Sequence, residues 1–277
     1  MPQPAFAQPS RQTAAPSRSV SVARLIRRAA PLVLGSVLAL LSGCVAMGDP
    51  ERPIPTVLVP APQPAQRLMV VLPGRGDDLA GLQASGIVHA VQGAWPDADV
   101  VLAELTLGYY MRGDAPERLH REVILPARAR GYREIWLAGA SMGGMGTLMY
   151  ERLHPGELDG LVLLAPFLGD RPLLREIRQA GGLAAWDPGP VQQVDGKTWQ
   201  RELWRHLKSW SGDSDRPGQV WLAYGDRDYL RDTLPPLAGL LPEDQVSTLP
   251  GGHTWTVWNR GMREALLAAD RKAGRTP

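Results

Sequence analysis

The sequence of 277 residues is poor in the residue types that build disulfides and metal sites. Cys44 is its only cysteine, so an intramolecular disulfide is excluded. No cluster of histidine, cysteine and acidic residues has the spacing of a metal site, and no Gly-Lys-Ser/Thr follows the glycine-rich turns as it would in a phosphate-binding loop. We therefore expect neither a metal nor a nucleotide cofactor, and a function that depends on ordinary side chains.

The first 43 residues contain no acidic residue. They contain five arginines and end in the apolar run Ala29–Leu41, which is shorter than the ~20 residues of a membrane-spanning helix. A basic stretch followed by a short apolar run is typical of a secretory signal peptide. Removal of this segment changes the formal net charge from +2 to −3, so the charge balance does not indicate nucleic-acid binding.

The apolar run closes with Leu41-Ser42-Gly43-Cys44, which resembles the lipobox of bacterial lipoproteins. The resemblance implies that residues 1–43 are a lipoprotein signal peptide and that lipidated Cys44 anchors an exported protein to a membrane of the cell envelope. The alternative is a free cysteine after an ordinary signal peptide. Val45, where inner-membrane lipoproteins of enteric bacteria have aspartate, favours the outer membrane facing the periplasm, and Arg27-Arg28 leaves twin-arginine export open beside the general route.

Residues 44–66 are rich in proline, which favours an extended tether over helix or sheet. A short edge strand over Ile54–Val59 remains possible. Residues 67–277 have the length of one domain.

Strand-like and helix-like segments alternate along this domain. Continuous apolar runs such as Leu68–Leu72 predict strands that are buried on both faces of a parallel sheet, and the alternation predicts a doubly wound α/β fold. The predicted strands are Arg67–Leu72, Asp99–Leu105, Arg133–Ala138, Gly160–Ala165, Gln219–Tyr224 and Gln245–Leu249. The predicted helices are Leu79–Ala94, Pro116–Arg130, Gly143–Leu153, Thr233–Leu241 and Thr256–Ala269.

The third predicted strand leads directly into Gly139-Ala140-Ser141-Met142-Gly143, and a predicted helix follows. A strand, a Gly-x-Ser-x-Gly turn and a helix form a nucleophile elbow, which presents a serine hydroxyl at the edge of a sheet. The motif alone is weak evidence, because short glycine-serine patterns are common, but its flanking segments have the required types. Ser141 is therefore our candidate nucleophile.

The order of motifs resembles that of the α/β-hydrolase superfamily over residues 66–272. In that family the nucleophile is followed along the chain by an acid and then a histidine, each after a later strand. The resemblance implies a mostly parallel, doubly wound sheet with helices on both faces and a small cap insertion, here residues 170–218.

Two later turns supply the other members of a triad. Gly225-Asp226-Arg227-Asp228 follows a predicted strand, and the family's spacing selects Asp228 as the acid, with Asp226 as the alternative. His253 follows the last predicted strand, where it could act as the base toward Ser141. The other histidines stand in helix-like or helix-terminal contexts, where we expect solvated or capping side chains; they are His89, His120, His154 and His206.

An oxyanion hole needs backbone N–H donors directed at the developing negative charge. The resemblance assigns these to Met142, directly after the nucleophile, and to Arg75 in the glycine-rich loop after the first core strand. Pro73 stands where the family often has histidine. The other interpretation of this loop is a simple strand-to-helix turn capped by Asp77 or Asp78.

Two further segments are candidates for the substrate pocket. Tyr109-Tyr110-Met111-Arg112 follows the second predicted strand, at the edge where α/β proteins bind ligands. Within residues 170–218, four apolar side chains share one helical face; they are Trp199, Leu203, Leu207 and Trp210. This face fits a lid helix over the site and fits ordinary core packing equally well.

We thus expect a membrane-anchored serine hydrolase that cleaves a small-molecule acyl ester through an acyl-enzyme and needs no cofactor. The alternatives are an amidase or peptidase, a thioesterase, or a non-catalytic binding lipoprotein on the same fold.

Overall fold

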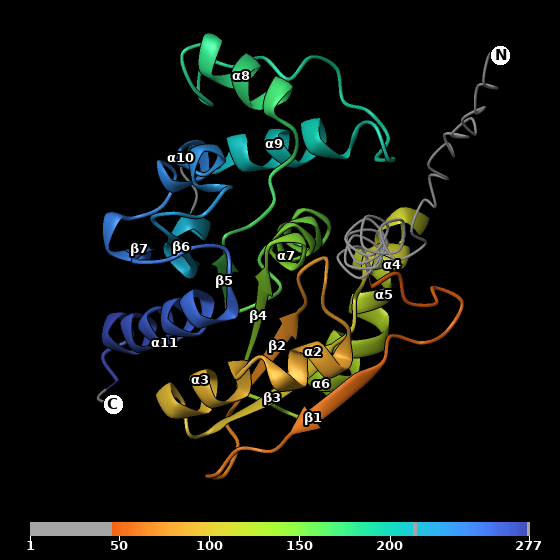
Figure 1. Cartoon of the computed structure of the whole chain (residues 1–277), viewed down its shortest axis with the longest axis vertical. Coiled ribbons are helices and arrows are strands. Elements are labelled where there is room, and N and C mark those ends of the chain that lie inside the picture. The colour runs from red at the N-terminus through yellow and green to blue at the C-terminus, as the bar shows by residue number, and fades with distance from the viewer. Residues whose placement is uncertain (1–45, 213–214, 276–277) are drawn as a thin grey trace, which may run out of the picture. The chain divides into compact units, whose positions relative to one another are not determined.

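The computed structural model describes residues 46–212 and 215–275 (Figure 1), so the expected signal peptide and Cys44 lie outside the described residues. Within them, seven strands form one sheet in the order β1-β3-β2-β4-β5-β6-β7. β1 runs antiparallel to β3, and every other pair is parallel. The strands are β1 (Thr56–Val59), β2 (Arg67–Leu72), β3 (Ala98–Ala103), β4 (Glu134–Ala140), β5 (Gly160–Leu164), β6 (Val220–Gly225) and β7 (Val246–Leu249).

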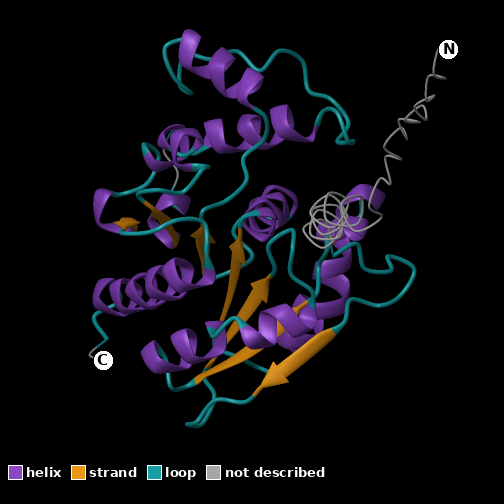
Figure 2. Cartoon of the chain, in the orientation of Figure 1, coloured by secondary structure: helices purple, strands orange, loops and turns teal. Residues whose placement is uncertain are grey.

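Helices cover both faces of the sheet, as Figure 2 shows. Alternate residues of β2 enter two separate apolar cores. Met69 and Val71 pack with α3 (Ile87–Ala94) and α11 (Trp255–Lys272), whereas Leu68, Val70 and Leu72 pack with helices that include α7 (Met142–Leu153). Coverage on both sides explains why β2, β3 and β5 are buried along their whole length. The predicted doubly wound α/β fold is confirmed.

Two predicted helices are divided, each for a local reason. Leu79–Ala94 is split into α2 (Leu79–Ala84) and α3 at Gly86, whose φ of 82° lies in the left-handed region. Pro116–Arg130 forms α5 (Ala115–Leu119), the π-helical turn η1 (His120–Ile124) and α6 (Leu125–Ala129). Pro126 lacks the N–H that would bond to the carbonyl four residues earlier, which accounts for the wider turn before α6.

The remaining helices lie at the carboxyl edge of the sheet or beyond it. None of the helices in the described ranges combines the length and apolarity needed to cross a membrane. In Figure 1, α8 and α9 lie beyond the arrowheads of β4 and β5. These helices are α4 (Leu107–Arg112), α8 (Arg171–Gln179), α9 (Trp199–Ser209) and the short α10 (Pro235–Ala238).

Part of the expected tether is bound to the domain. The carbonyl of Met47 accepts hydrogen bonds from Gly108 N–H at 2.8 Å and from the Thr106 hydroxyl at 3.0 Å, and Ala46 O accepts from Leu107 N–H at 3.4 Å. These donors belong to the first turn of α4 and its preceding residue, where a helix leaves N–H groups without internal partners. Residues 46–54, the N-terminal segment below, therefore supply backbone acceptors to α4, and the edge strand β1 follows them.

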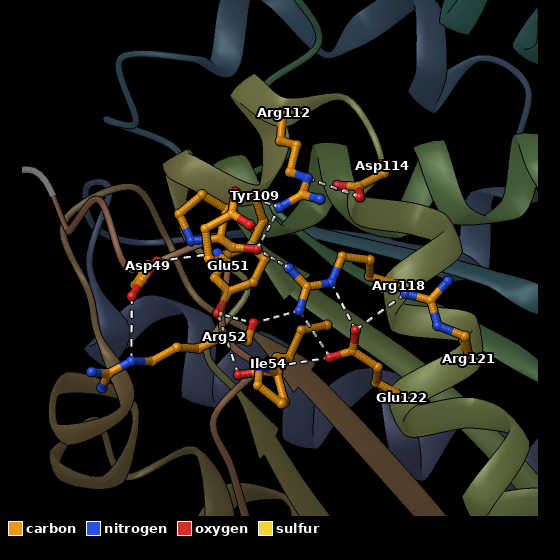
Figure 3. Close-up of polar contacts among 12 residues, drawn as sticks. Asp49, Glu51, Arg52, Ile54, Tyr109, Arg112, Asp114, Arg118, Arg121 and Glu122 are labelled. Atoms are coloured by element: carbon orange, nitrogen blue, oxygen red, sulfur yellow. Dashed lines mark hydrogen bonds and ion pairs between the residues drawn. The ribbon is translucent and has the colours of Figure 1, made fainter.

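A buried arginine fixes the other end of the N-terminal segment, as Figure 3 shows. Arg118 of α5 donates to the carbonyls of Pro50 and Arg52 and forms an ion pair with Glu122 at 2.7 Å. Glu122 in turn accepts the N–H of Ile54 at 2.8 Å. The Arg118 side chain is 7 % exposed, so water does not replace these partners easily.

Replacement of Arg118 tests whether the N-terminal segment is part of the folded domain. We expect Arg118→Met to lower the free energy of unfolding by about 2–4 kcal/mol, because it removes the buried ion-pair partner of Glu122 and the donor to two carbonyls. Chemical denaturation measures the change. Arg121→Met is the matched control: Arg121 also contacts Glu122, but its side chain is 65 % exposed, and its loss should cost less than about 1 kcal/mol. Equal effects of the two variants would contradict the assignment.

Candidate active site

Ser141 lies at the sharp turn between β4 and α7, where the sequence predicts it. Its φ of 53° and ψ of −111° are unfavourable for a residue with a side chain, and the side chain is largely buried. The turn is held by a hydrogen bond from Ser141 N–H to Leu164 O at 2.8 Å and by one from Phe167 N–H to Ser141 O at 2.9 Å. The surrounding backbone thus maintains a strained serine at the carboxyl edge of the sheet.

The glycines beside the serine are required by close backbone packing. A Cβ at Gly139 would lie 2.1 Å from the carbonyl oxygen of Gly143, and a Cβ at Gly143 would lie 2.6 Å from the carbonyl oxygen of Leu72. Backbone cannot yield as a flexible side chain can. The elbow motif therefore packs α7 directly against the ends of β2 and β4.

Asp228 and His253 meet after β6 and β7. The His253 Nδ1 atom lies 2.8 Å from Asp228 Oδ2, and the other carboxylate oxygen of Asp228 accepts the N–H of Leu230 at 2.8 Å. Asp228 is completely buried, whereas the His253 side chain retains 12 % of its exposure. A buried carboxylate with both oxygens occupied can orient an imidazole and stabilise its protonated form.

Asp226, the alternative acid, has a different position. Its side chain is about half exposed and accepts the N–H of Gly251 at 2.8 Å. Its own N–H donates to Leu249 O, and the next residue, Arg227, donates to Gly251 O. Asp226 therefore joins the turn after β6 to the turn after β7, and it makes no contact with His253 within the described residues.

Two aromatic rings that the sequence analysis did not single out hold His253 between them. The ring centroid of Tyr229 lies 4.4 Å from that of His253, and the ring of Trp258 meets the imidazole edge-to-face at 4.7 Å. Trp258 is buried in α11, whereas Tyr229 is 66 % exposed. In the sequence, Tyr229 directly follows Asp228, and Trp258 stands five residues after His253. Neither spacing is specific enough to predict a contact with the imidazole.

One candidate oxyanion donor belongs to the elbow itself, and the other belongs to the loop after β2. Met142 is the first residue of α7, and Arg75 lies in the loop after β2. Gly74 of this loop is close to the nucleophile, since a Cβ built on it would lie 3.9 Å from Ser141 Cβ. Neither the Met142 nor the Arg75 amide donates a hydrogen bond to another described residue. Both N–H groups are thus free to donate a hydrogen bond to a ligand oxygen.

Among the described residues, no hydrogen bond joins the Ser141 hydroxyl to the His253 imidazole. The elbow, the Arg75 loop and the His253 turn nevertheless lie at the same edge of the sheet. Hydrogen bonds between nucleophile and base are often long without substrate and shorten when it binds.

The other histidines lie outside this constellation. His89 is exposed, as expected, whereas the His154 side chain at the end of α7 is mostly buried and stacks on His120. His206 on α9 is not solvated: burial, with smaller contributions from Arg152 and Arg216, lowers its pKa to about 4. His206 is therefore neutral near pH 7, and its ring meets that of Trp210 edge-to-face at 5.6 Å.

His120, His154 and Glu157 form a group whose composition suits a transition metal. The two imidazole rings are stacked at 4.1 Å with an angle of 11° between their planes. The in-plane lone pairs of the two rings therefore lie in nearly parallel planes and do not converge on one point. His120 Nδ1 instead contacts the Tyr150 hydroxyl at 3.0 Å and Glu157 at 3.2 Å. We interpret the group as a side-chain network.

The expected cap helix is α9. Leu203, Leu207 and Trp210 are buried, and Trp199 packs against Phe167 with ring centroids 5.9 Å apart. Because the N–H of Phe167 bonds to the Ser141 carbonyl, the start of α9 lies near the elbow.

The other segment expected to line the pocket is residues 109–112. Its two tyrosines pack against other parts of the domain. Tyr109 is buried, with its hydroxyl near the Arg52 carbonyl of the N-terminal segment. The Tyr110 hydroxyl is buried beside Gly146 of α7, since a Cβ built there would lie 2.0 Å from it. Met111, in contrast, is 71 % exposed.

Comparison with known families identifies the class of enzyme. Residues 124–269 match the model of the esterase family described as "Putative esterase", a match that covers more than half of the chain and includes Ser141, Asp228 and His253. The chain belongs to this family and is a serine ester hydrolase. No curated protein matches the sequence significantly.

Solved structures of hydrolases share the fold. Est1E from Butyrivibrio proteoclasticus superposes with a TM-score of 0.56 at 14 % identity, covering 78 % of this chain and 93 % of its own. FphF, a fluorophosphonate-binding serine hydrolase of Staphylococcus aureus, gives 0.51 at 15 % identity over 76 % and 90 %. The monoacylglycerol lipase of Paleococcus ferrophilus gives 0.50 at 15 % over 78 % and 98 %. At these identities the likeness establishes the fold alone.

Proposed function

We propose that Ser141, His253 and Asp228 form a catalytic triad that hydrolyses a carboxylic ester through an acyl-enzyme. The observation that carries the proposal is the 2.8 Å contact between His253 and the fully buried Asp228, at the same sheet edge as the strained Ser141. Asp228 is preferred to Asp226 because Asp226 contacts backbone at the Gly251 turn. The reaction class, ester hydrolysis, is inferred from the family, and the mechanism is inferred from the positions of these three residues.

In the first half-reaction, His253 Nε2 takes the proton of the Ser141 hydroxyl as the oxygen attacks the ester carbonyl. Asp228 accepts the Nδ1–H of the imidazole and stabilises the imidazolium that results. The oxygen of the tetrahedral intermediate receives hydrogen bonds from the amides of Met142 and Arg75. The intermediate collapses when His253 returns the proton to the leaving alcohol, and Ser141 remains acylated.

In the second half-reaction, His253 takes a proton from water, which attacks the acyl carbonyl. The same two amides stabilise the second intermediate. Its collapse releases the carboxylic acid and returns the proton to Ser141.

The ester preference is tested by a matched pair of substrates. We expect hydrolysis of p-nitrophenyl acetate and butyrate, with a kcat/KM at least about 10³-fold above that for p-nitroacetanilide, because the anilide carbonyl is less electrophilic and its aniline is a poorer leaving group than p-nitrophenolate. The acetyl thioester of thiophenol serves as a thioester substrate, and its kcat/KM is compared with that of p-nitrophenyl acetate. Equal rates on the anilide would replace the esterase assignment by an amidase.

We further propose that residues 1–43 direct export and that Cys44 carries the lipid anchor. The N-terminal segment is bound to α4 from Ala46 onward, so such an anchor would hold this edge of the domain close to the bilayer. Cys44→Ser should abolish labelling with radioactive palmitate and move the protein from the membrane pellet to the soluble fraction. Unchanged labelling and sedimentation would overturn the anchor.

A further inference from the structure

We infer that the hydrogen bond between Asp77 and Trp255 is a positioning link. It fixes the loop that carries the Arg75 amide relative to His253, the proposed catalytic base. Trp255 Nε1 donates to Asp77 Oδ2 at 3.0 Å across 178 residues of sequence. Asp77 belongs to the loop that carries the Arg75 amide, and Trp255 stands two residues after His253. The inference rests on the proposed triad and adds two residues to its support.

At the loop end, the Asp77 carboxylate lies beside the backbone that forms the oxyanion hole. The backbone N–H of Asp77 donates to Gly74 O at 3.2 Å, and a Cβ built on Gly74 would lie 3.3 Å from Asp77 Oδ2. The same Cβ would lie 3.9 Å from Ser141 Cβ. Displacement of Asp77 would therefore move the Gly74–Arg75 peptide relative to the nucleophile.

At the base end, Trp255 continues a chain of aromatic contacts to the imidazole. Its ring meets Trp258 edge-to-face at 5.0 Å, and Trp258 meets His253 in the same manner at 4.7 Å. Edge-to-face pairs fix the relative orientation of rings. The link thus connects Asp77, Trp255, Trp258 and His253 without any of the first three touching the reacting atoms.

The Asp77 carboxylate does not cap the helix that follows its loop. The helix that follows the loop, α2, is capped by Asp78, whose carboxylate accepts the N–H of Gly81 at 2.8 Å. No cation of the described ranges pairs with Asp77, and its pKa is raised because burial disfavours the charged form, an effect that the Trp255 N–H opposes. A half-buried carboxylate with a single side-chain donor indicates a role for that contact.

Three variants of the full chain test the link with p-nitrophenyl acetate. Trp255→Phe keeps an aromatic ring and removes the N–H, Asp77→Ala removes the acceptor, and Asp77→Asn retains an acceptor oxygen. We expect kcat to fall about 10- to 100-fold in the first two variants, with KM within about threefold of wild type, because small displacements of catalytic groups cost rate. Asp77→Asn should recover most of the kcat, and the Asp77→Ala/Trp255→Phe double variant should be no slower than either single variant.

The matched control is Trp95→Phe. Trp95 Nε1 donates to Leu266 O in the core on one face of the sheet, so its loss should lower the thermal midpoint and leave kcat unchanged. Unchanged kcat in Trp255→Phe, additive losses in the double variant, or no recovery in Asp77→Asn would each overturn the link. A wild-type chain that hydrolyses no ester would instead overturn the proposed function, so the two failures are distinguishable.

Discussion

Ser141→Ala is expected to reduce kcat/KM for p-nitrophenyl esters by at least about 10⁴-fold, because the variant lacks the hydroxyl that the proposed mechanism acylates. The methyl side chain tolerates the φ of 53° about as well as serine does, so the variant should fold. Initial rates on p-nitrophenyl acetate, with thermal unfolding measured in parallel, give the result.

Residual activity within tenfold of wild type in a folded Ser141→Ala variant would mean that Ser141 is not the nucleophile. Ser211, an exposed serine after α9, provides the matched control. Ser211→Ala should leave kcat/KM within about twofold of wild type, because its hydroxyl lies outside the proposed machinery.

The second large effect separates the two candidate acids. Asp228→Asn should lower kcat by about 10⁴-fold, because a neutral amide at 2.8 Å from His253 Nδ1 no longer stabilises the imidazolium and can hold the wrong tautomer. Asp226→Asn should keep kcat within about threefold, since an amide oxygen still accepts the Gly251 N–H. Steady-state kinetics on both variants compares them directly.

The stability of the two variants supplies a further distinction. Asp226 is half exposed, so its replacement should change the free energy of unfolding by less than about 1 kcal/mol. A loss of kcat in Asp226→Asn equal to that in Asp228→Asn would show that the connection between the two turns, and not the Asp228 charge, limits the reaction.

The sequence predicted the framework because its signals are local. The predicted strands coincide with β2 to β7 to within two residues at each end, and the Gly-x-Ser-x-Gly motif located the elbow. The order of Ser141, Asp228 and His253 also placed those three residues at one sheet edge, since the carboxyl ends of parallel strands share an edge.

The features that sequence analysis missed depend on contacts between distant segments. Proline content predicted a tether over residues 44–66, but composition does not reveal that α4 leaves N–H donors for Met47 O. The contact of Asp77 with Trp255 spans most of the domain and has no spacing signature. Gly86 and Pro126 could be seen in the sequence as residues that disfavour a helix. The helical pattern nevertheless continued through both, so the break at Gly86 and the wide turn before Pro126 were not predicted.

The most direct test of the triad is labelling of the purified chain with a fluorophosphonate probe, followed by mass spectrometry of the modified peptide. The account predicts one adduct, on Ser141, and its absence from Ser141→Ala. Labelling of Asp228→Asn should be strongly slowed. An adduct on another residue, or none on a folded wild-type chain that hydrolyses esters, would contradict the assignment of Ser141 as the nucleophile.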